Sequence, residues 1–348
     1  MKRKSTRDLG KASEIDANIP AAKAKNAPEP IMKSTASREI PSEEIPKDNQ
    51  NLLFLSAWHG DIPKLKESLN KGAQVDGKSE WHGQTALSIA ILEGHKDIVE
   101  ILLENGANPN GMIERMIDAE QRTALMAAVV SGNNEIVELL IEHGAKMDEK
   151  DEMGRTALMI AARTHKDIVK FLLEKGANLN EKDGHHGNNA LNHAVKAGNK
   201  HIAELLIDNG TKVDEKNEDG QTALMIAINH SDRNAVVLSG VVELLIEKGA
   251  NVNEKDNEGR TPLMHAYGEI KIAEFLLANG AKVDEKNDDG ETALIEIAHS
   301  ELPDAVKLLI DNGADINEKD NSGKTALMIA QEYGNEKVVK VLLDHGAR

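Results

Sequence analysis

The chain has 348 residues, no cysteine and only 2% aromatic residues. The lack of cysteine excludes disulfide cross-links, thiolate nucleophiles and cysteine-based zinc sites, and it fits a reducing compartment. The net charge is −17: residues 1–48 carry ten Lys/Arg and eight Asp/Glu, and residues 49–348 carry 32 and 51. An acidic region of this kind repels phosphate backbones and anionic lipid, so we expect no binding to nucleic acid.

The sequence also argues against a membrane protein or a protein with a secretory signal. It has no run of about 18 apolar residues that could span a bilayer, and no apolar core follows Lys2-Arg3-Lys4 to make a signal peptide. We therefore expect a soluble, cytoplasmic chain without membrane insertion. Its richness in Lys, Asn, Glu and Ile is typical of AT-rich bacterial genomes.

Residues 1–48 differ from the rest of the chain. They contain five prolines among Ala, Ser, Lys and Glu, and they show no helical or strand periodicity. Such a segment buries too little apolar surface to offset the entropy of ordering, so we predict a disordered basic leader. The cluster Lys2, Arg3, Lys4 and Arg7 is open to two interpretations, a solvated basic end or a targeting signal, and short charge runs are usually the former.

From residue 49 onward one pattern recurs eight times. It reads Gly-x-Thr-Ala-Leu or a close variant, then an apolar stretch, then Ile-Val-x-x-Leu-Leu and Gly-Ala, and Thr123, Thr156 and Asn189 follow one another at 33 residues. A period near 33 residues predicts stacked units that share one core, rather than separate globular domains. Nine units can be counted, at about 49–76, 80–110, 119–148, 151–180, 184–214, 217–253, 256–284, 287–317 and 320–348.

Residues 153–180 illustrate one unit. Gly154 suits a backbone turn that a Cβ atom would strain, and Thr156 is placed to cap the short helix that follows. A second helix is expected over 167–175 because its apolar residues share one side, and Gly176 should end it in a left-handed conformation. The polar stretch 181–183 suits a hairpin finger that projects from the stack.

The period, the glycines and the Thr-Ala-Leu motif resemble the ankyrin repeat of bacterial-type proteins, whose motif is Thr-Pro-Leu-His-x-Ala. The resemblance covers about 300 of the 348 residues and implies an all-α, ankyrin-repeat solenoid: an L-shaped helix pair and a finger per unit, in a curved stack. It also implies partner binding along the concave side, which fingers and first helices form. The motif's His is Met at five positions, and we expect thioether packing there rather than heme or copper ligation: Met126, Met159, Met225, Met264 and Met328.

Two insertions break the period. Thr85 and Thr123 are 38 residues apart, and the extra residues lengthen a finger; Thr222 and Thr261 are 39 apart, and residues around 231–240 lengthen the turn between two helices. The longer finger carries four apolar residues that either form a contact patch or fold back onto neighbouring units: Met112, Ile113, Met116 and Ile117.

The two tryptophans are in adjacent units, which predicts an N-terminal binding surface of Trp58, Trp81, His82 and Gln84, because tryptophan is enriched in binding hot spots. Trp58 could instead cap the first core layer. The equivalent finger positions further along are also predicted to contact the partner: Met153 and Arg155, then His185 and His186. From the sixth unit these positions turn acidic, which favours a partner with a basic surface.

Catalytic and metal sites are not indicated. His185 and His186 lack the third and fourth ligands that zinc requires, and the recurring Glu of the Glu-Lys-Asp/Asn stretch is a repeat signature rather than a catalytic pair. No Ser-His-Asp group, phosphate-binding loop or dinucleotide fingerprint stands outside the repeats. We therefore predict a monomeric, non-catalytic protein–protein interaction scaffold without a cofactor. The alternative is a secreted effector of an intracellular bacterium, exported into a host cell to act on a host protein through the same surface.

Overall fold

A computed structural model describes residues 48–79, 83–114, 121–230, 235–266 and 268–348. The chain divides into two compact units, residues 1–44 and 45–348, and the first of these lies outside the described residues. The predicted leader therefore lies outside them too, except for Asp48, whose side chain caps the first helix by accepting a hydrogen bond from the Gln50 backbone N–H.

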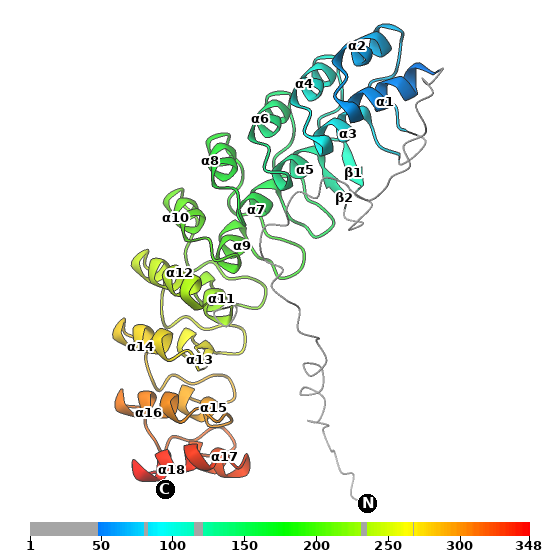
Figure 1. The fold of residues 1–348 in the computed structure, drawn as a ribbon. Coiled ribbons are helices and arrows are strands. Elements are labelled where there is room, and N and C mark those ends of the chain that lie inside the picture. The colour runs from blue at the N-terminus through cyan, green and yellow to red at the C-terminus, as the bar shows by residue number, and fades with distance from the viewer. Residues whose placement is uncertain (1–47, 80–82, 115–120, 231–234, 267) are drawn as a thin grey trace, which may run out of the picture. The chain divides into compact units, whose positions relative to one another are not determined.

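The described residues form eighteen helices in nine helix-turn-helix pairs, which we number as units 1 to 9 in chain order (Figure 1). The first helices of the units are α1 (Asn49–His59), α3 (Ala86–Glu93), α5 (Ala124–Val130), α7 (Ala157–Ala161), α9 (Ala190–Lys196), α11 (Ala223–Asn229), α13 (Pro262–His265), α15 (Ala293–Ile297) and α17 (Ala326–Glu332). The second helices are α2 (Ile62–Asn70), α4 (Lys96–Glu104), α6 (Asn134–Glu142), α8 (Lys166–Glu174), α10 (Lys200–Asp208), α12 (Ala235–Glu247), α14 (Ile270–Ala278), α16 (Pro303–Asp311) and α18 (Glu336–Asp344).

The predicted all-α repeat array is confirmed, with one addition. The longer finger of unit 3 contains two short strands, β1 (Met112–Glu114) and β2 (Gln121–Thr123), which pair antiparallel. The second insertion was expected to lengthen a turn, but residues 235–240 belong to α12, which has 13 residues where most other second helices have nine. The inserted residues 231–234 lie outside the described part of the chain.

Each first helix begins at a residue whose side chain caps it. The Thr156 hydroxyl accepts a hydrogen bond from the Met159 N–H at 3.4 Å, as predicted, and Asn189 does the same for Asn192 at 3.0 Å. Gly176 follows α8 with a φ of 88°, which an L side chain rarely adopts. Helices of five to nine residues are too short to be stable alone, so their stability must come from packing between units.

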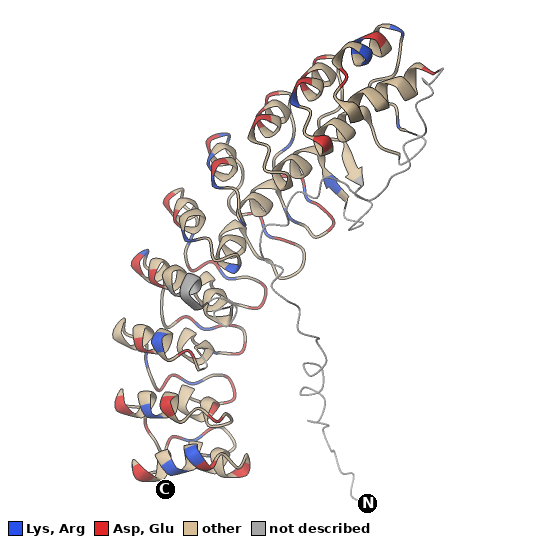
Figure 2. Cartoon of the chain, in the orientation of Figure 1, with Lys and Arg blue, Asp and Glu red and all other residues tan. Residues whose placement is uncertain are grey.

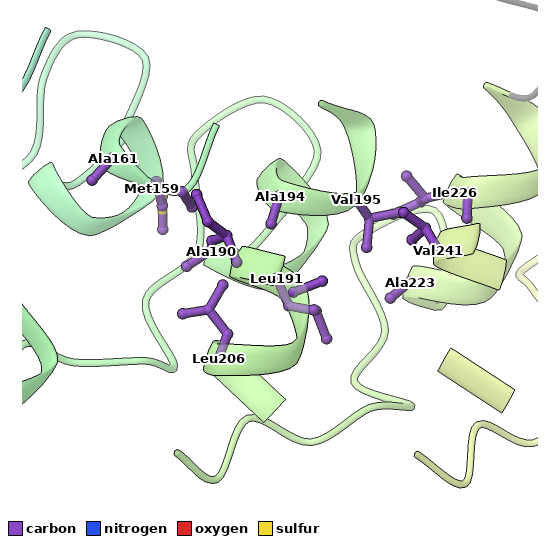
Figure 3. Close-up of a cluster of buried hydrophobic side chains, with 14 of the residues drawn as sticks. Met159, Ala161, Ala190, Leu191, Ala194, Val195, Leu206, Ala223, Ile226 and Val241 are labelled. Atoms are coloured by element: carbon purple, nitrogen blue, oxygen red, sulfur yellow. The ribbon is translucent and has the colours of Figure 1, made fainter. Parts of the chain in front are cut away.

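The core is mainly aliphatic and runs through all the units as one cluster. Figure 3 shows part of it, with labelled residues between Met159 and Val241. Leu191 on α9 and Leu206 on α10 are buried within it, and small alanines such as Ala190 allow neighbouring first helices to come close. The expected thioether packing is confirmed for four of the five methionines, which are at most 3% exposed. The fifth, Met328 on α17 of unit 9, is 47% exposed.

Candidate protein-binding surface

Fingers and first helices form one continuous surface along the described units. Each first helix packs against the next, from α1 and α3 through to α15 and α17. The fingers, which are the loops that precede the first helices, lie on the side of these helices rather than on the side of the second helices (Figure 1). We call this the finger/first-helix surface.

A carboxylate or amide at the base of each finger of units 4 to 9 shapes its turn. In unit 4 the Asp151 carboxylate accepts hydrogen bonds from the backbone N–H groups of Met153 and Arg155, at 3.0 and 2.8 Å. In unit 6 the Asn217 side-chain oxygen accepts from Asp219 and Gln221 at 3.0 and 2.8 Å. Such side-chain-to-backbone turns fix the direction of the finger without using the residues at its tip.

Backbone hydrogen bonds join the finger tips of units 4 to 9. The N–H of Asn257 donates to the Asp219 carbonyl at 3.1 Å, and the N–H of Asp288 donates to the Glu258 carbonyl at 3.0 Å. The same bond recurs from Gly184 to Met153, from Glu218 to His186 and from Asn321 to Asp289. The tips are therefore held in register by the main chain.

Five equivalent lysines link the base of each finger to the next unit. Their Nζ atoms donate to a backbone carbonyl of that unit at 2.8–3.0 Å and pair with its glutamate at 2.7–3.0 Å. We call these five residues the lysine ladder: Lys150, Lys182, Lys216, Lys255 and Lys286. The recurring Glu-Lys-Asp/Asn stretch therefore has a structural role that its sequence signalled only as a repeat.

The predicted N-terminal residues separate into three groups. Trp58 is half-buried on α1 and packs against the core, and its carbonyl oxygen lies 3.1 Å from His95 Nε2 of unit 2. Gln84 is buried, so the expectation that its side chain faces a partner is wrong. Trp81 and His82 lie outside the described residues. The binding role of Trp58 stays a prediction, and its burial also fits the capping alternative.

The apolar finger of unit 3 is only partly exposed. Met112 is 50% exposed, whereas Ile113 is 2% exposed and belongs to the core. Successive residues of a strand point to opposite faces, so β1 cannot present both side chains outward. The expected contact role of Ile113 is therefore wrong, and for this residue the fold-back alternative holds. Met116 and Ile117 lie beyond the part of the chain that the structure describes.

The predicted contacts in units 4 and 5 also differ from one another. Arg155 is bound to its own finger base, with Nη2 and Nε at 2.7 and 2.8 Å from Asp151 Oδ2, and its side chain is only 15% exposed. This guanidinium therefore supports the finger turn, and its role in contacting a partner stays a prediction. Met153 is half-buried, and His185 and His186 are exposed at their finger tip, with His186 Nδ1 3.2 Å from Asp219 Oδ2.

Two histidines whose role was not predicted from the sequence stabilise the fingers of their units. His193 Nε2 lies 3.0 Å from Asp183 Oδ2, and His265 Nε2 lies 2.8 Å from Asp256 Oδ2, in each case joining the first helix to its own finger base. Burial opposes ionisation of Asp183, but the hydrogen bonds from His193 and from two backbone N–H groups outweigh it and hold the Asp183 pKa well below its usual range. Burial lowers the pKa of His265 despite its bond to Asp256. The signal was a histidine at the same motif position in both units.

A buried carboxylate occupies that position in unit 8. Glu296 on α15 is 6% exposed, and its Oε1 lies 3.1 Å from Arg260 Nε of the preceding finger. Burial raises the pKa of Glu296 to about 7; Arg260 opposes this shift, and Glu291 adds to it. Negative charge is therefore crowded in this part of the surface.

Charge is unevenly distributed along the finger/first-helix surface. In units 4 and 5, residues 151–164 and 183–198 carry three Asp/Glu and three Lys/Arg. In units 6 to 9, residues 217–230, 256–268, 287–301 and 320–334 carry eleven Asp/Glu and two Lys/Arg. Figure 2 shows the second helices, by contrast, with both signs of charge along the stack. We call the fingers and first helices of units 6 to 9 the acidic end.

Among the described residues, no group of three or more His, Asp or Glu is placed to hold a metal ion. Within these residues no helix combines the length and the apolar character needed to cross a membrane.

Comparison with known proteins agrees with this architecture. The family described as ankyrin repeats (3 copies) matches residues 21–113, 110–183, 191–287 and 268–348, and ankyrin repeats (many copies) match 161–207. Palmitoyltransferase ZDHHC13 of Homo sapiens is 35% identical over 191 residues, 54% of this chain and 30% of the relative. Palmitoyltransferase ZDHHC17 is 40% identical in Homo sapiens and 38% in Danio rerio over 183 residues, 52% of this chain and 28% or 29% of the relative.

These alignments span less than a third of each relative, and the similarity lies in their ankyrin-repeat regions. The relatives named here are vertebrate proteins, so the bacterial origin inferred from composition is not supported. The family matches extend over most of the residues that form the nine stacked helix pairs, and on both grounds the chain belongs to the ankyrin-repeat family.

Proposed function

We propose that this ankyrin-repeat chain is a non-catalytic scaffold that binds another protein through its finger/first-helix surface, with a basic surface of the partner against the acidic end. The observation that supports it is the contrast between eleven Asp/Glu with two Lys/Arg in units 6 to 9 and an even balance in units 4 and 5. Equivalent positions in equivalent units differ in charge, so the repeat itself does not require the acidic residues.

The framework beneath these residues favours binding. Backbone bonds between the tips and the lysine ladder hold the fingers in place before a partner arrives, which reduces the entropy lost on association. An acidic surface steers a basic partner toward it, and the association rate should fall as salt rises.

The palmitoyltransferase activity in the relatives' names is not part of this proposal. That activity belongs to proteins of which 28–30% aligns with this chain, in their ankyrin-repeat regions. Nor does any feature of the described residues favour the exported-effector alternative over a scaffold.

The test compares the wild-type chain with two variants of equal net charge. One variant, E218Q/D288N/D289N, neutralises exposed tips at the acidic end, and the control, E243Q/E274Q/D311N, neutralises exposed residues on second helices. Each serves as bait in quantitative affinity purification at low and at raised salt. We expect the control to retain the wild-type partners and the tip variant to lose them. Equal recovery by both variants would contradict the proposal.

A further inference from the structure

An apolar row runs along the ends of the first three first helices. Trp58, Leu92 and Val130 occupy equivalent positions in units 1, 2 and 3, each four residues before the first residue of the second helix. Val130 is 36% exposed, the other two are half-buried, and Met112 on the finger of the same unit as Val130 is 50% exposed. Because α1 packs on α3 and α3 on α5, these residues occupy successive steps of one surface. We call the four residues the apolar row.

The apolar row ends after unit 3. The residue at the same helix position is Ala162 in unit 4, Lys196 in unit 5, Ala266 in unit 7, His299 in unit 8 and Glu332 in unit 9. This position therefore changes from large apolar residues to small or polar ones along the stack, and the last of them lies in the acidic end. The two ends of the finger/first-helix surface differ in chemistry.

Other exposed apolar residues do not extend the row. Met328, Tyr333 and Leu343 are exposed, but all three lie within unit 9. The methionines equivalent to Met328 in earlier units are buried, so its exposure reflects the position of its unit in the stack. Met112 and Val130 are exposed although units lie on both sides of them.

We propose that the partner binds as one linear segment that places apolar side chains on the apolar row and a run of Lys or Arg on the acidic end. This inference rests on the proposed function and adds a second contact and a spacing. Exposed apolar residues on one part of a surface and excess charge of one sign on another are complementary to a ligand that carries both chemistries.

The stack sets the separation between the two parts of the ligand. Packed helices are about 10 Å apart, so three steps from unit 3 to unit 6 span roughly 30 Å, or about nine extended residues. Units 4 and 5 carry three Asp/Glu and three Lys/Arg on this surface, so they offer no net attraction to basic residues placed next to the apolar anchor. The first excess of acidic residues along the segment comes in unit 6, so the basic run lies that far from the anchor.

Joining the two contacts should increase affinity beyond either one. Once one end of the segment is bound, the other end is held at a high effective concentration near its own site, provided that the linker spans the distance. A linker that is too short forbids simultaneous binding, and the gain is then lost.

The experiment measures binding of fluorescein-labelled synthetic peptides to the full chain by fluorescence anisotropy. The joined peptide has a Leu/Ile anchor, a Gly/Ser linker of about nine residues and an arginine run; the others lack the anchor, lack the arginines or have a two-residue linker. The receptor variants are M112S/V130S at the row, the tip variant E218Q/D288N/D289N, and a control, L343S, which removes an exposed apolar side chain from a second helix, outside both contacts.

We expect the joined peptide to bind at least about tenfold tighter than either part. M112S/V130S should reduce it to the affinity of the arginine peptide, the tip variant should reduce it to that of the anchor peptide, and L343S should leave it unchanged. If the anchor adds no affinity, or if the peptide with the two-residue linker binds as tightly as the joined peptide, this inference is wrong. The proposed function still stands in that case, provided that arginine peptides bind the wild-type chain and that the tip variant abolishes their binding. If the tip variant changes no peptide's affinity, both are wrong.

Discussion

Replacing Gly220 with alanine tests whether contact between finger tips stabilises the stack. Gly220 lies in the finger of unit 6 with a φ of 73°. A Cβ atom there would lie 2.5 Å from the backbone nitrogen of Asn257 in the next finger, and it would also meet that residue's side-chain oxygen. Real Cβ atoms do not approach a backbone atom so closely, so the two fingers must separate. The Asn257 N–H bond to the Asp219 carbonyl would then weaken.

The expected cost has two parts. An L residue in the left-handed region costs about 1–2 kcal/mol, and forcing extra volume into a packed contact costs about 1–3 kcal/mol. Gly249, at the end of unit 6, separates them because its φ is 90° but no atom lies within 4 Å of a built Cβ. We therefore expect G249A to lower the free energy of unfolding by the first amount alone, and G220A by about 2–5 kcal/mol in total.

Urea unfolding of the full chain, followed by far-UV circular dichroism, measures both variants. Hydrogen exchange then shows where the change occurs: the amide of Asn257 should exchange faster in G220A than in the wild-type chain or in G249A, because its acceptor has moved away. Equal unfolding free energies for the two variants, with unchanged exchange at Asn257, would refute the claim that tip contacts couple the units.

The other expectations concern single side chains, each measured by urea unfolding. Because burial raises the pKa of Glu296 to about 7, the folded chain holds this proton more tightly than the unfolded chain does. The free energy of unfolding should therefore fall as pH rises from about 4.5 to 7. The unfolding free energy of E296Q should match that of the wild-type chain near pH 4 and exceed it by up to about 3 kcal/mol near pH 8. T222A removes the cap of α11 and should cost about 1 kcal/mol. K216M removes one step of the half-exposed ladder and should cost at most about 1 kcal/mol, whereas L206A opens a buried cavity and should cost about 2–5 kcal/mol. A flat pH profile for wild type, no loss in T222A, or K216M as damaging as L206A would contradict the corresponding argument.

The sequence predicted the repeated elements because they depend on local chemistry. Thr156 caps α7 with its own hydroxyl, and Gly176 follows α8 in the left-handed region, so neither feature requires knowledge of the neighbouring units. The apolar side of each second helix likewise follows from residue spacing within one helix. Together these signals were sufficient to predict the stacked helix pairs.

The orientation of finger side chains could not be predicted in the same way. Arg155 was assigned to partner binding, but the turn returns its guanidinium to Asp151. Ile113 was placed on an exposed patch, but strand pairing directs it into the core. The carbonyl that accepts from Lys216 belongs to Lys255, 39 residues away, and nothing near Lys216 in the sequence identifies it. These outcomes depend on where the next unit lies.

The way in which the fingers are joined bears on why the acidic end exists. The bonds between tips run from backbone N–H to backbone carbonyl, as from Asn257 to Asp219, so they place no requirement on the tip side chains. The same framework accepts Met153 in unit 4, His186 in unit 5 and Asp289 in unit 8. Excess like charge costs stability through repulsion; at Glu296 burial is the main cause of the raised pKa, and the nearby carboxylate of Glu291 adds to it. Asp256 and Asp320 shape their finger turns, but folding gives no such reason for exposed tip carboxylates such as Glu218, Asp288 and Asp289, whereas binding a basic partner does.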